Sequence, residues 1–265
     1  MVKENRTVDK SICYPRKENM RKTELGTWAE IPTPYVTHIM AKAGFDFSII
    51  DMEHGVIDFE LAQNMIYAAH SENRQIYVRV PVIEEAWILR TLDMGCDGII
   101  FPQVSSVRDI EKIIEYAYFA PVGNRGFNPY IAAGGYSSVR SDYFENENRR
   151  IKVGVILEGK EAFEDLDKIL RYDEIDIIYI GQYDLSMALG VPGDVTNTKV
   201  TELMDKAVTK INIAGKKAGC MVHSIEEAKK IIKQGFSFIV YKVDSGLLFQ
   251  SVQNFVKGVQ ESEVI

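Results

Sequence analysis

Two acidic residues, Glu158 and Asp184, each follow a β-rich run and have no Cys or His beside them in the sequence. Carboxylate oxygens of this kind suit a hard divalent cation such as Mg²⁺ or Mn²⁺, which keeps several waters that a substrate can replace. Each acid could instead cap the helix that follows its strand, and for one carboxylate the two interpretations are about equally balanced. Two acids on neighbouring strands favour the metal site modestly.

The segment 51–55 (Asp-Met-Glu-His-Gly) places His54 between an apolar run and a turn. A nearby carboxylate could orient one ring nitrogen and leave the other as a base near neutral pH, although a buried structural histidine is an equal alternative. Asp51 and Glu53 either orient such groups or simply start the next helix. Arg79 lies in an apolar strand and needs an anion, for which a ligand is favoured over a protein carboxylate.

Three further polar residues follow later strands, and their chemistry stays open. Lys242 could form a Schiff base with a ketone if its pKa were lowered, or it could be a solvated charge at the rim. Tyr183 precedes Asp184 and carries a phenol to the same place, while His223 follows another strand. His223 is intermediate between His54 and the histidines His38 and His70, which lie on predicted helices and are mainly expected to be structural.

The elements that must position these residues alternate between short β-rich runs and longer stretches with helical periodicity, which indicates a parallel sheet covered by helices. Eight strands are predicted, at 24–29, 45–52, 75–80, 97–101, 152–157, 175–180, 218–222 and 237–242. Eight strands in a chain of 265 residues predict a single α/β domain, a (β/α)8 TIM barrel, for which roughly 250 residues are typical. The reactive residues then share the C-terminal rim of the barrel.

Periodicity and capping residues support the helices. Two predicted helix faces consist of Phe59, Ala62, Ile66 and Ala69, and of Val107, Ile110, Ile114 and Ala117. Ser224 and Glu227 have capping-box spacing, and Gly95 and Gly235 stand where a left-handed residue ends a helix.

The domain is expected to span 23–265 after a polar N-terminal segment, 1–22. Residues 118–150 lack a clean period, which predicts a long lid or subunit-contact loop between the fourth helix and the fifth strand. An additional amphipathic helix is expected at the C-terminus; its apolar positions are Leu248, Val252, Phe255, Val256 and Val259.

The composition excludes several classes of partner. The net charge is −7, and no basic block follows the pattern of a nucleic-acid surface. The polar start and the absence of an apolar run of about 18 residues predict a cytoplasmic protein without a membrane partner. Three cysteines, Cys13, Cys96 and Cys220, have no paired spacing and are expected to be reduced, the last two in the core.

Several motifs, in order over most of the chain, resemble the HpcH/HpaI family of class II pyruvate aldolases, which includes the 2-keto-3-deoxy sugar-acid and dihydroxyheptenedioate aldolases. The matching segments are Ala43-Gly-Phe-Asp, Ile49-Ile-Asp-Met-Glu-His-Gly, Val78-Arg-Val-Pro, Leu92-Asp-Met-Gly, Gly98-Ile-Ile-Phe-Pro, Pro121-Val-Gly-Asn-Arg-Gly and Gly181-Gln-Tyr-Asp-Leu-Ser.

The resemblance implies that Glu158 and Asp184 hold Mg²⁺, Mn²⁺ or Co²⁺ and that Arg79 neutralises the oxygens of pyruvate. It also implies that His54 is the acid/base residue and that Asp93 pairs with a histidine across a subunit boundary. The implied reaction is cleavage of a 4-hydroxy-2-oxo acid to pyruvate, or a close 2-oxo acid, and an aldehyde through a metal-stabilised enolate. The implied assembly is a homo-oligomer, a hexamer or trimer, whose neighbours exchange the final helix.

The chain also departs from the family pattern. Ile156 and Gly159 replace a glutamine and a threonine around Glu158, and Gln182 and Tyr183 replace a proline and a small residue before Asp184. These departures leave two alternatives open: a Schiff-base lyase that uses Lys242, and a catalytically altered relative that binds a 2-oxo acid.

Overall fold

The computed structural model describes residues 23–138 and 141–261. Eight strands form one closed parallel barrel, in which neighbours along the chain are also neighbours in space and β8 pairs with β1. The strands are β1 (Glu24–Ala29), β2 (Phe47–Asp51), β3 (Gln75–Arg79), β4 (Gly98–Phe101), β5 (Lys152–Leu157), β6 (Ile177–Ile180), β7 (Lys217–Val222) and β8 (Phe238–Val243). The predicted (β/α)8 barrel is therefore confirmed.

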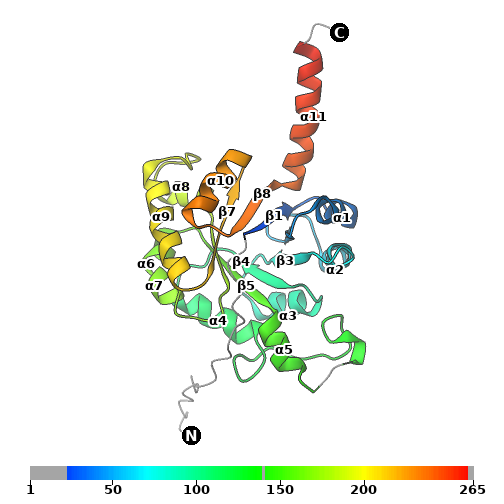
Figure 1. Ribbon diagram of the computed structural model, residues 1–265. Helices are drawn as coiled ribbons and strands as arrows, with labels where there is room; N and C mark the ends of the chain where they lie inside the picture. The colour runs from blue at the N-terminus through cyan, green and yellow to red at the C-terminus, as the bar shows by residue number, and fades with distance from the viewer. Residues whose placement is uncertain (1–22, 139–140, 262–265) are drawn as a thin grey trace.

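Helices surround the barrel, and one projects away from it (Figure 1). They are α1 (Pro34–Ala43), α2 (Phe59–His70), α3 (Glu85–Asp93), α4 (Val107–Ala117), α5 (Tyr143–Arg150), α6 (Lys160–Glu164), α7 (Leu166–Ile169), α8 (Gln182–Ala188), α9 (Thr198–Ile213), α10 (Ile225–Gln234) and α11 (Asp244–Glu261). None of the helices within the described ranges is long and apolar enough to cross a membrane.

Alternating residues of the strands fill the inside of the barrel. This interior cluster consists of Trp28, Phe47, Ile49, Tyr77, Ile100, Ile156, Ile177, Tyr179, Phe238 and Val240. Glycines leave room for the largest of these side chains: a Cβ on Gly26 would lie 2.3 Å from the Phe47 ring, and one on Gly154 would lie 2.4 Å from Ile100. The interior is thus a packed core, and its period of two fixes which residue of each strand reaches the rim.

A second core lies between the strands and the helices. Ala62, Ile66 and Ala69 of the predicted α2 face are buried there, and so are Ile110 and Ala117 of the predicted α4 face. Both faces are therefore confirmed, and burial of this apolar area is the main force that holds each helix on the barrel.

Ser224 and the two glycines have their expected capping roles, whereas the Glu227 carboxylate accepts from the His223 amide in place of the Ser224 amide that a capping box uses. The hydroxyl of Ser224 accepts from the Glu227 amide, and Gly95 and Gly235 have positive φ at the ends of α3 and α10. Cys96 and Cys220 are free and buried, as expected. Cys13 and the predicted polar segment 1–22 lie outside the described residues.

The segment 118–150 is not a loop throughout. It ends in α5, and a 3₁₀ turn at Gly135–Ser137 precedes that helix. The helical period is hard to see because the sequence of α5, YFENENRR, is strongly polar and its one buried residue is Glu147. Packed aromatic rings anchor the segment, with Phe127 and Phe144 only 4.8 Å apart between ring centroids.

The additional C-terminal helix is confirmed as α11, 18 residues long. Figure 1 shows it extending away from the barrel. Its large apolar side chains are exposed: Leu248, Phe249, Val252, Phe255 and Val256. Among residues 23–138 and 141–261, the helix therefore leaves an apolar face without cover.

Candidate active site

The period of two in the strands brings polar residues to the C-terminal rim of the barrel. Asp51 stands two residues after Ile49, Arg79 two after Tyr77, and Glu158 two after Ile156, and the earlier residue of each pair is in the interior cluster. Their side chains therefore extend from the top of the packed interior. This rim is where barrels of this kind carry their chemistry.

Arg79 is held by protein carboxylates. Its Nε donates to Asp51 Oδ1 at 2.9 Å and its Nη2 to Asp51 Oδ2 at 2.6 Å, while Nη1 lies 2.9 Å from Glu53 Oε2. The guanidinium also stacks over the Trp28 ring, 4.4 Å from its centroid. The sequence favoured a ligand anion over a protein carboxylate as the partner of Arg79; this is corrected, because Asp51 and Glu53 pair with it.

Asp51 both orients Arg79 and shapes the turn after β2. It is fully buried, and its Oδ1 also accepts from the backbone amides of Glu53 and His54 at 3.0 and 3.2 Å. A carboxylate with several such donors is fixed in place. Of the two roles considered for Asp51 from the sequence, the orienting role is present, whereas the next helix, α2, has Asp58 as its N-cap.

Gln103, which follows β4, links two acids of the site. Its side-chain amide donates to Glu53 Oε1 at 3.1 Å, and its backbone amide bonds to Glu158. Gln103 has a φ of 54°, a left-handed conformation that is costly for a residue with a Cβ. Such strain is common at functional sites. The sequence analysis missed Gln103, although it is a polar residue two positions after the end of β4, where rim residues are expected.

Glu158 and Asp184 lie close together at the rim. The pKa of Glu158 is raised to about 7, mainly by burial and then by the negative charges of Asp184 and Glu53, against smaller opposing effects of Arg79 and the Gln103 amide. Gly181 permits this approach, because a Cβ there would lie 2.9 Å from Glu158 Cγ. Asp184 occupies the first turn of α8. The predicted pair of acids is thus brought together.

The donor set fits a divalent cation. Arg79 already pairs with two other acids and offsets the charges of Glu158 and Asp184 only in part. The charge of Asp184 is, after burial, the second cause of the raised pKa of Glu158. Within residues 23–138 and 141–261 no group of three acidic, His or Cys side chains surrounds a metal position. Two carboxylates nevertheless suffice for Mg²⁺ or Mn²⁺, which take their remaining ligands from water and substrate.

Glu30 is a further rim residue that the sequence analysis missed. It follows the predicted first strand and stands two residues after Trp28, so the same period of two could have identified it. Burial raises its pKa, and the charges of Asp51 and Asp244 act in the same direction, while Arg79 and His54 oppose them. Glu30 thus adds a further carboxylate to the rim, close enough to Asp51 for the two charges to interact.

His54 is exposed at the rim. Its backbone amide donates to Asp51, and its positive form favours the ionised state of Glu30. Within residues 23–138 and 141–261 the imidazole of His54 forms no hydrogen bond. The expected orientation of the ring by a neighbouring carboxylate is therefore not present in this chain alone.

Asp93 is not brought to the rim residues. It is the last residue of α3, and its Oδ1 accepts from Arg125 Nη2 at 3.1 Å. Burial raises the pKa of Asp93, against the opposing charge of Arg125. A helix that follows a barrel strand runs back toward the N-terminal ends of the strands. Within one chain, therefore, Asp93 is separate from His54.

Lys242 is turned away from the site. A register irregularity between β1 and β8 accompanies its φ of 53°, and Val240 and Val243 rather than Lys242 face the interior cluster. Its Nζ donates to Gln250 Oε1 of α11 at 2.7 Å. The residue predicted as an alternative Schiff-base lysine therefore contacts the C-terminal helix.

Tyr183, which precedes Asp184 in the sequence, forms a hydrogen-bonded pair with His223. The Tyr183 hydroxyl lies 2.9 Å from His223 Nε2, and the two rings meet edge to face. Tyr183 belongs to the first turn of α8 and His223 follows β7. The side chains of Tyr183 and Asp184 therefore both come from the start of one helix.

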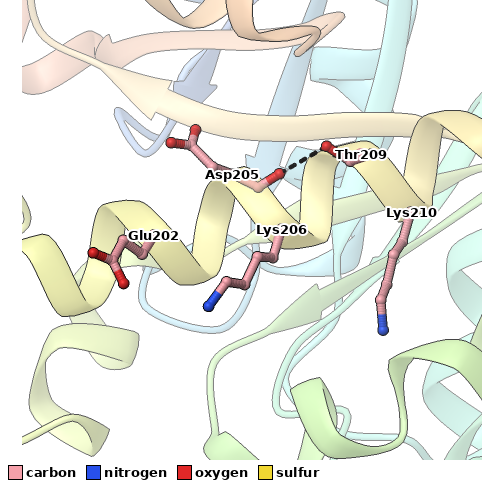
Figure 2. A pocket seen from close by; sticks show the side chains of 5 residues that line it. All are labelled: Glu202, Asp205, Lys206, Thr209 and Lys210. Carbon is pink, nitrogen blue, oxygen red and sulfur yellow. Dashed lines mark hydrogen bonds between the residues drawn. The ribbon is translucent and has the colours of Figure 1, made fainter.

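A separate hollow lies on the outer side of the molecule along α9 (Figure 2). Its lining residues are Glu202, Asp205, Lys206, Thr209 and Lys210. All five come from one helix, so the hollow lacks the convergence of different elements that a catalytic site requires.

Comparisons with known proteins identify the family of the chain. Residues 24–251 match the HpcH/HpaI aldolase/citrate lyase family. The 2-keto-3-deoxy-L-rhamnonate aldolase of Salmonella paratyphi A is 28% identical over 245 residues, which cover 92% of each chain.

Solved structures are similar in the same way. An HpcH/HpaI aldolase from Desulfitobacterium hafniense has a TM-score of 0.86 and 26% identity, and the match covers 91% of this chain and 93% of that one. The citrate synthase SbnG has a TM-score of 0.83 and 27% identity, with 91% and 94% covered. The chain therefore belongs to the HpcH/HpaI aldolase/citrate lyase family, as the sequence motifs predicted.

Proposed function

We propose that this protein is a divalent-metal-dependent carbon–carbon lyase that cleaves a 4-hydroxy-2-oxo acid to pyruvate, or a close 2-oxo acid, and an aldehyde. One observation carries the proposal: Glu158 and Asp184 form an unbalanced pair of acids beside Arg79 on the catalytic rim. The aldolase relatives give the reaction class. A cytoplasmic location, expected from the sequence, belongs to the same proposal.

Glu158 and Asp184 would hold the cation. A bound Mg²⁺, Mn²⁺ or Co²⁺ would supply positive charge beside the carboxylate and keto oxygens of the substrate. The metal preference is part of the proposal, since oxygen ligands suit all hard cations of this size.

Arg79 would stabilise the negative charge that develops on the keto oxygen. Its position is fixed before substrate arrives, because Asp51 and Glu53 hold three of its nitrogens and Trp28 supports its flat face. Fixed charges stabilise a transition state without reorganisation at the moment of reaction. Asp51 and Glu53 are thus positioning residues for Arg79.

His54 would transfer the proton of the aldehyde-derived hydroxyl, through a water. Its exposure leaves both ring nitrogens open to water, and general acid–base catalysis of this kind contributes about 10²–10⁴-fold. Tyr183, beside Asp184, would contact the substrate on the other side of the acids.

The proposal includes a homo-oligomer, a trimer or hexamer. The exposed apolar face of α11 needs a partner, and Phe249 and Phe255 are 66% and 73% exposed. A second copy would also bring the Asp93 region of one chain near the His54 region of its neighbour, which a single chain does not do. Asp93 would then act by orienting the histidine of that neighbour.

The experiment is a cleavage assay. Purified protein with Mg²⁺, Mn²⁺ or Co²⁺ is given a panel of 4-hydroxy-2-oxo acids, and pyruvate release is followed. We expect release from at least one of them, and a loss of more than about 10²-fold in Glu158→Gln. Glu164→Gln, on the exposed side of α6, is the matched control and should retain activity. If no metal supports cleavage of any compound in the panel, the proposal is wrong.

A further inference from the structure

Gln103 stands between two parts of the site and contacts one acid from each. Its side-chain amide donates to Glu53 Oε1 at 3.1 Å, and its backbone amide bonds to Glu158. Glu53 in turn pairs with Arg79 through its other oxygen, Oε2, at 2.9 Å. One residue thus connects the guanidinium that would meet the substrate with a carboxylate that would hold the cation.

The carboxylate of Glu53 depends on Gln103 for its orientation. Among residues 23–138 and 141–261, Glu53 Oε2 is buried and receives no hydrogen bond, although Arg79 lies within ion-pair distance of it. An ion pair attracts a charge from any direction, whereas a hydrogen bond has a preferred angle. The bond from Gln103 to Oε1 therefore fixes the rotation of this carboxylate, and with it the support that Arg79 receives.

The backbone of Gln103 is held in its left-handed conformation from both sides. Phe101 and Val104 are buried before and after it, and Ser106 begins α4 with a capping box that Asp109 completes. A strained φ such as 54° persists only where the surrounding structure fixes it. This conformation turns the backbone amide and the side chain toward two different acids.

The place of Gln103 in the barrel suits a bridge between Arg79 and Glu158. Arg79 lies on β3 and Glu158 follows β5, and β4 pairs with both of these strands. The proposed reaction needs the guanidinium and the cation to act on oxygens of one small 2-oxo acid. A misplacement of about 1 Å between such groups can cost about 10²-fold in rate.

We infer that Gln103 is a positioning residue that sets the spacing between Arg79 and Glu158. Its side chain acts through Glu53 on the direction of the guanidinium, and its backbone amide holds Glu158. The inference rests on the proposed lyase function and adds to it the residue that aligns the two sources of positive charge around the 2-oxo acid.

Gln103→Met tests the side chain, because it keeps the length and the backbone amide and removes the donor. For exchange of the methyl protons of pyruvate with Mn²⁺, we expect kcat to fall about 10-fold, as for one hydrogen bond to a charged group, and KM to stay within about 3-fold. Oxalate, a planar analogue of the enolate of pyruvate, should bind about 10-fold more weakly in calorimetry. The affinity for Mn²⁺ alone should not change, because the backbone amide remains.

Two further variants separate positioning from support of the fold. In a Glu53→Ala background, Gln103→Met should have little further effect on exchange or on oxalate binding, since its route is already removed. Gln103→Gly adopts the left-handed conformation without strain. It should unfold at the same or a higher urea concentration than the wild type, and still lose exchange about 10-fold. A residue that only supported the fold would lose stability and rate together.

Gln234→Met is the matched control, because Gln234 of α10 donates to the Asp205 carboxylate of α9 at 3.0 Å, away from the rim residues. Its rate and oxalate affinity should equal those of the wild type. Wild-type values in Gln103→Met, weakened Mn²⁺ binding in it, or effects that add in full to those of Glu53→Ala would each overturn the inference and leave the lyase standing. Absence of exchange in the wild type would overturn the proposed function and, with it, this inference.

Discussion

Asp51 and Arg79 lie directly opposite each other on β2 and β3 and join their side chains in a two-pronged ion pair, with contacts of 2.9 and 2.6 Å. Asp51 is fully buried and the Arg79 side chain is 11% exposed. The register of β2 against β3 therefore sets the orientation of the Arg79 guanidinium, which the proposed reaction uses.

Loss of this partner should destabilise the protein. Asp51→Ala leaves a nearly buried guanidinium with one acid instead of two, and breaking a buried pair in this way costs about 3–5 kcal/mol. Urea unfolding measures the change. Lys168→Ala is the control, because Lys168 is 63% exposed in its pair with Asp165 and such pairs contribute about 0–1 kcal/mol. Equal losses in the two variants would contradict the account of Asp51.

Stability of the metal-free protein should depend on the ionisation of Glu158. Its pKa is raised from 4.5 to about 7 in the folded state, so between these values the folded protein holds a proton that the unfolded chain has released. The free energy of unfolding should therefore fall as pH rises from about 4.5 through 7. Glu158→Gln should reduce this slope.

Metal should reverse that trend, because a cation needs the ionised carboxylate and stabilises only the folded state. Unfolding curves between pH 5 and 8, with Mn²⁺ or with EDTA, measure both effects. An identical pH slope in Glu158→Gln and in Glu164→Gln would show that Glu158 does not carry the effect.

Lys242 should not form a covalent adduct. Its Nζ bonds to Gln250 and lies outside the interior cluster, so borohydride with pyruvate should trap nothing on it. Mass spectrometry of the treated, metal-free protein tests this, and Lys242→Ala should retain lyase activity within a few-fold. A pyruvate-sized mass increase on Lys242 would favour the Schiff-base alternative.

The exposed face of α11 should hold the oligomer together. Phe255→Glu places a charge in the proposed apolar contact and should shift the protein toward a smaller species in light scattering. Asn254→Glu adds the same charge one position away, at an exposed residue outside the apolar stripe, and should leave the mass unchanged. A wild-type monomer would contradict the proposed assembly.

Much of the fold follows from local sequence patterns, because each strand and helix has its own period and the glycines and caps mark the ends. α5 was missed because its charged sequence carries no apolar stripe. The pairing of Glu158 with Asp184 was predictable since strand order sets the rim. The ion pairs of Arg79 with Asp51 and Glu53 could not be predicted. They depend on the side-chain directions after β2 and on the register of β2 against β3, which the sequence does not state.

Some features of the site depend on single backbone conformations. Gln103 reaches both Glu53 and Glu158 because of its left-handed φ, and Lys242 leaves the interior for a similar reason. Neither residue is of a type that favours this conformation, so no sequence rule predicts it. The pairing proposed for Asp93 is not visible in one chain, because its proposed partner histidine belongs to another copy.

Deuterium exchange of the methyl protons of pyruvate, followed by NMR, tests the central claim most directly. The account predicts exchange with Mn²⁺ or Mg²⁺, loss of exchange with EDTA that added metal restores, and loss in Glu158→Gln but not in Glu164→Gln. Exchange that continues at the wild-type rate after chelation, or in metal-loaded Glu158→Gln, would contradict it.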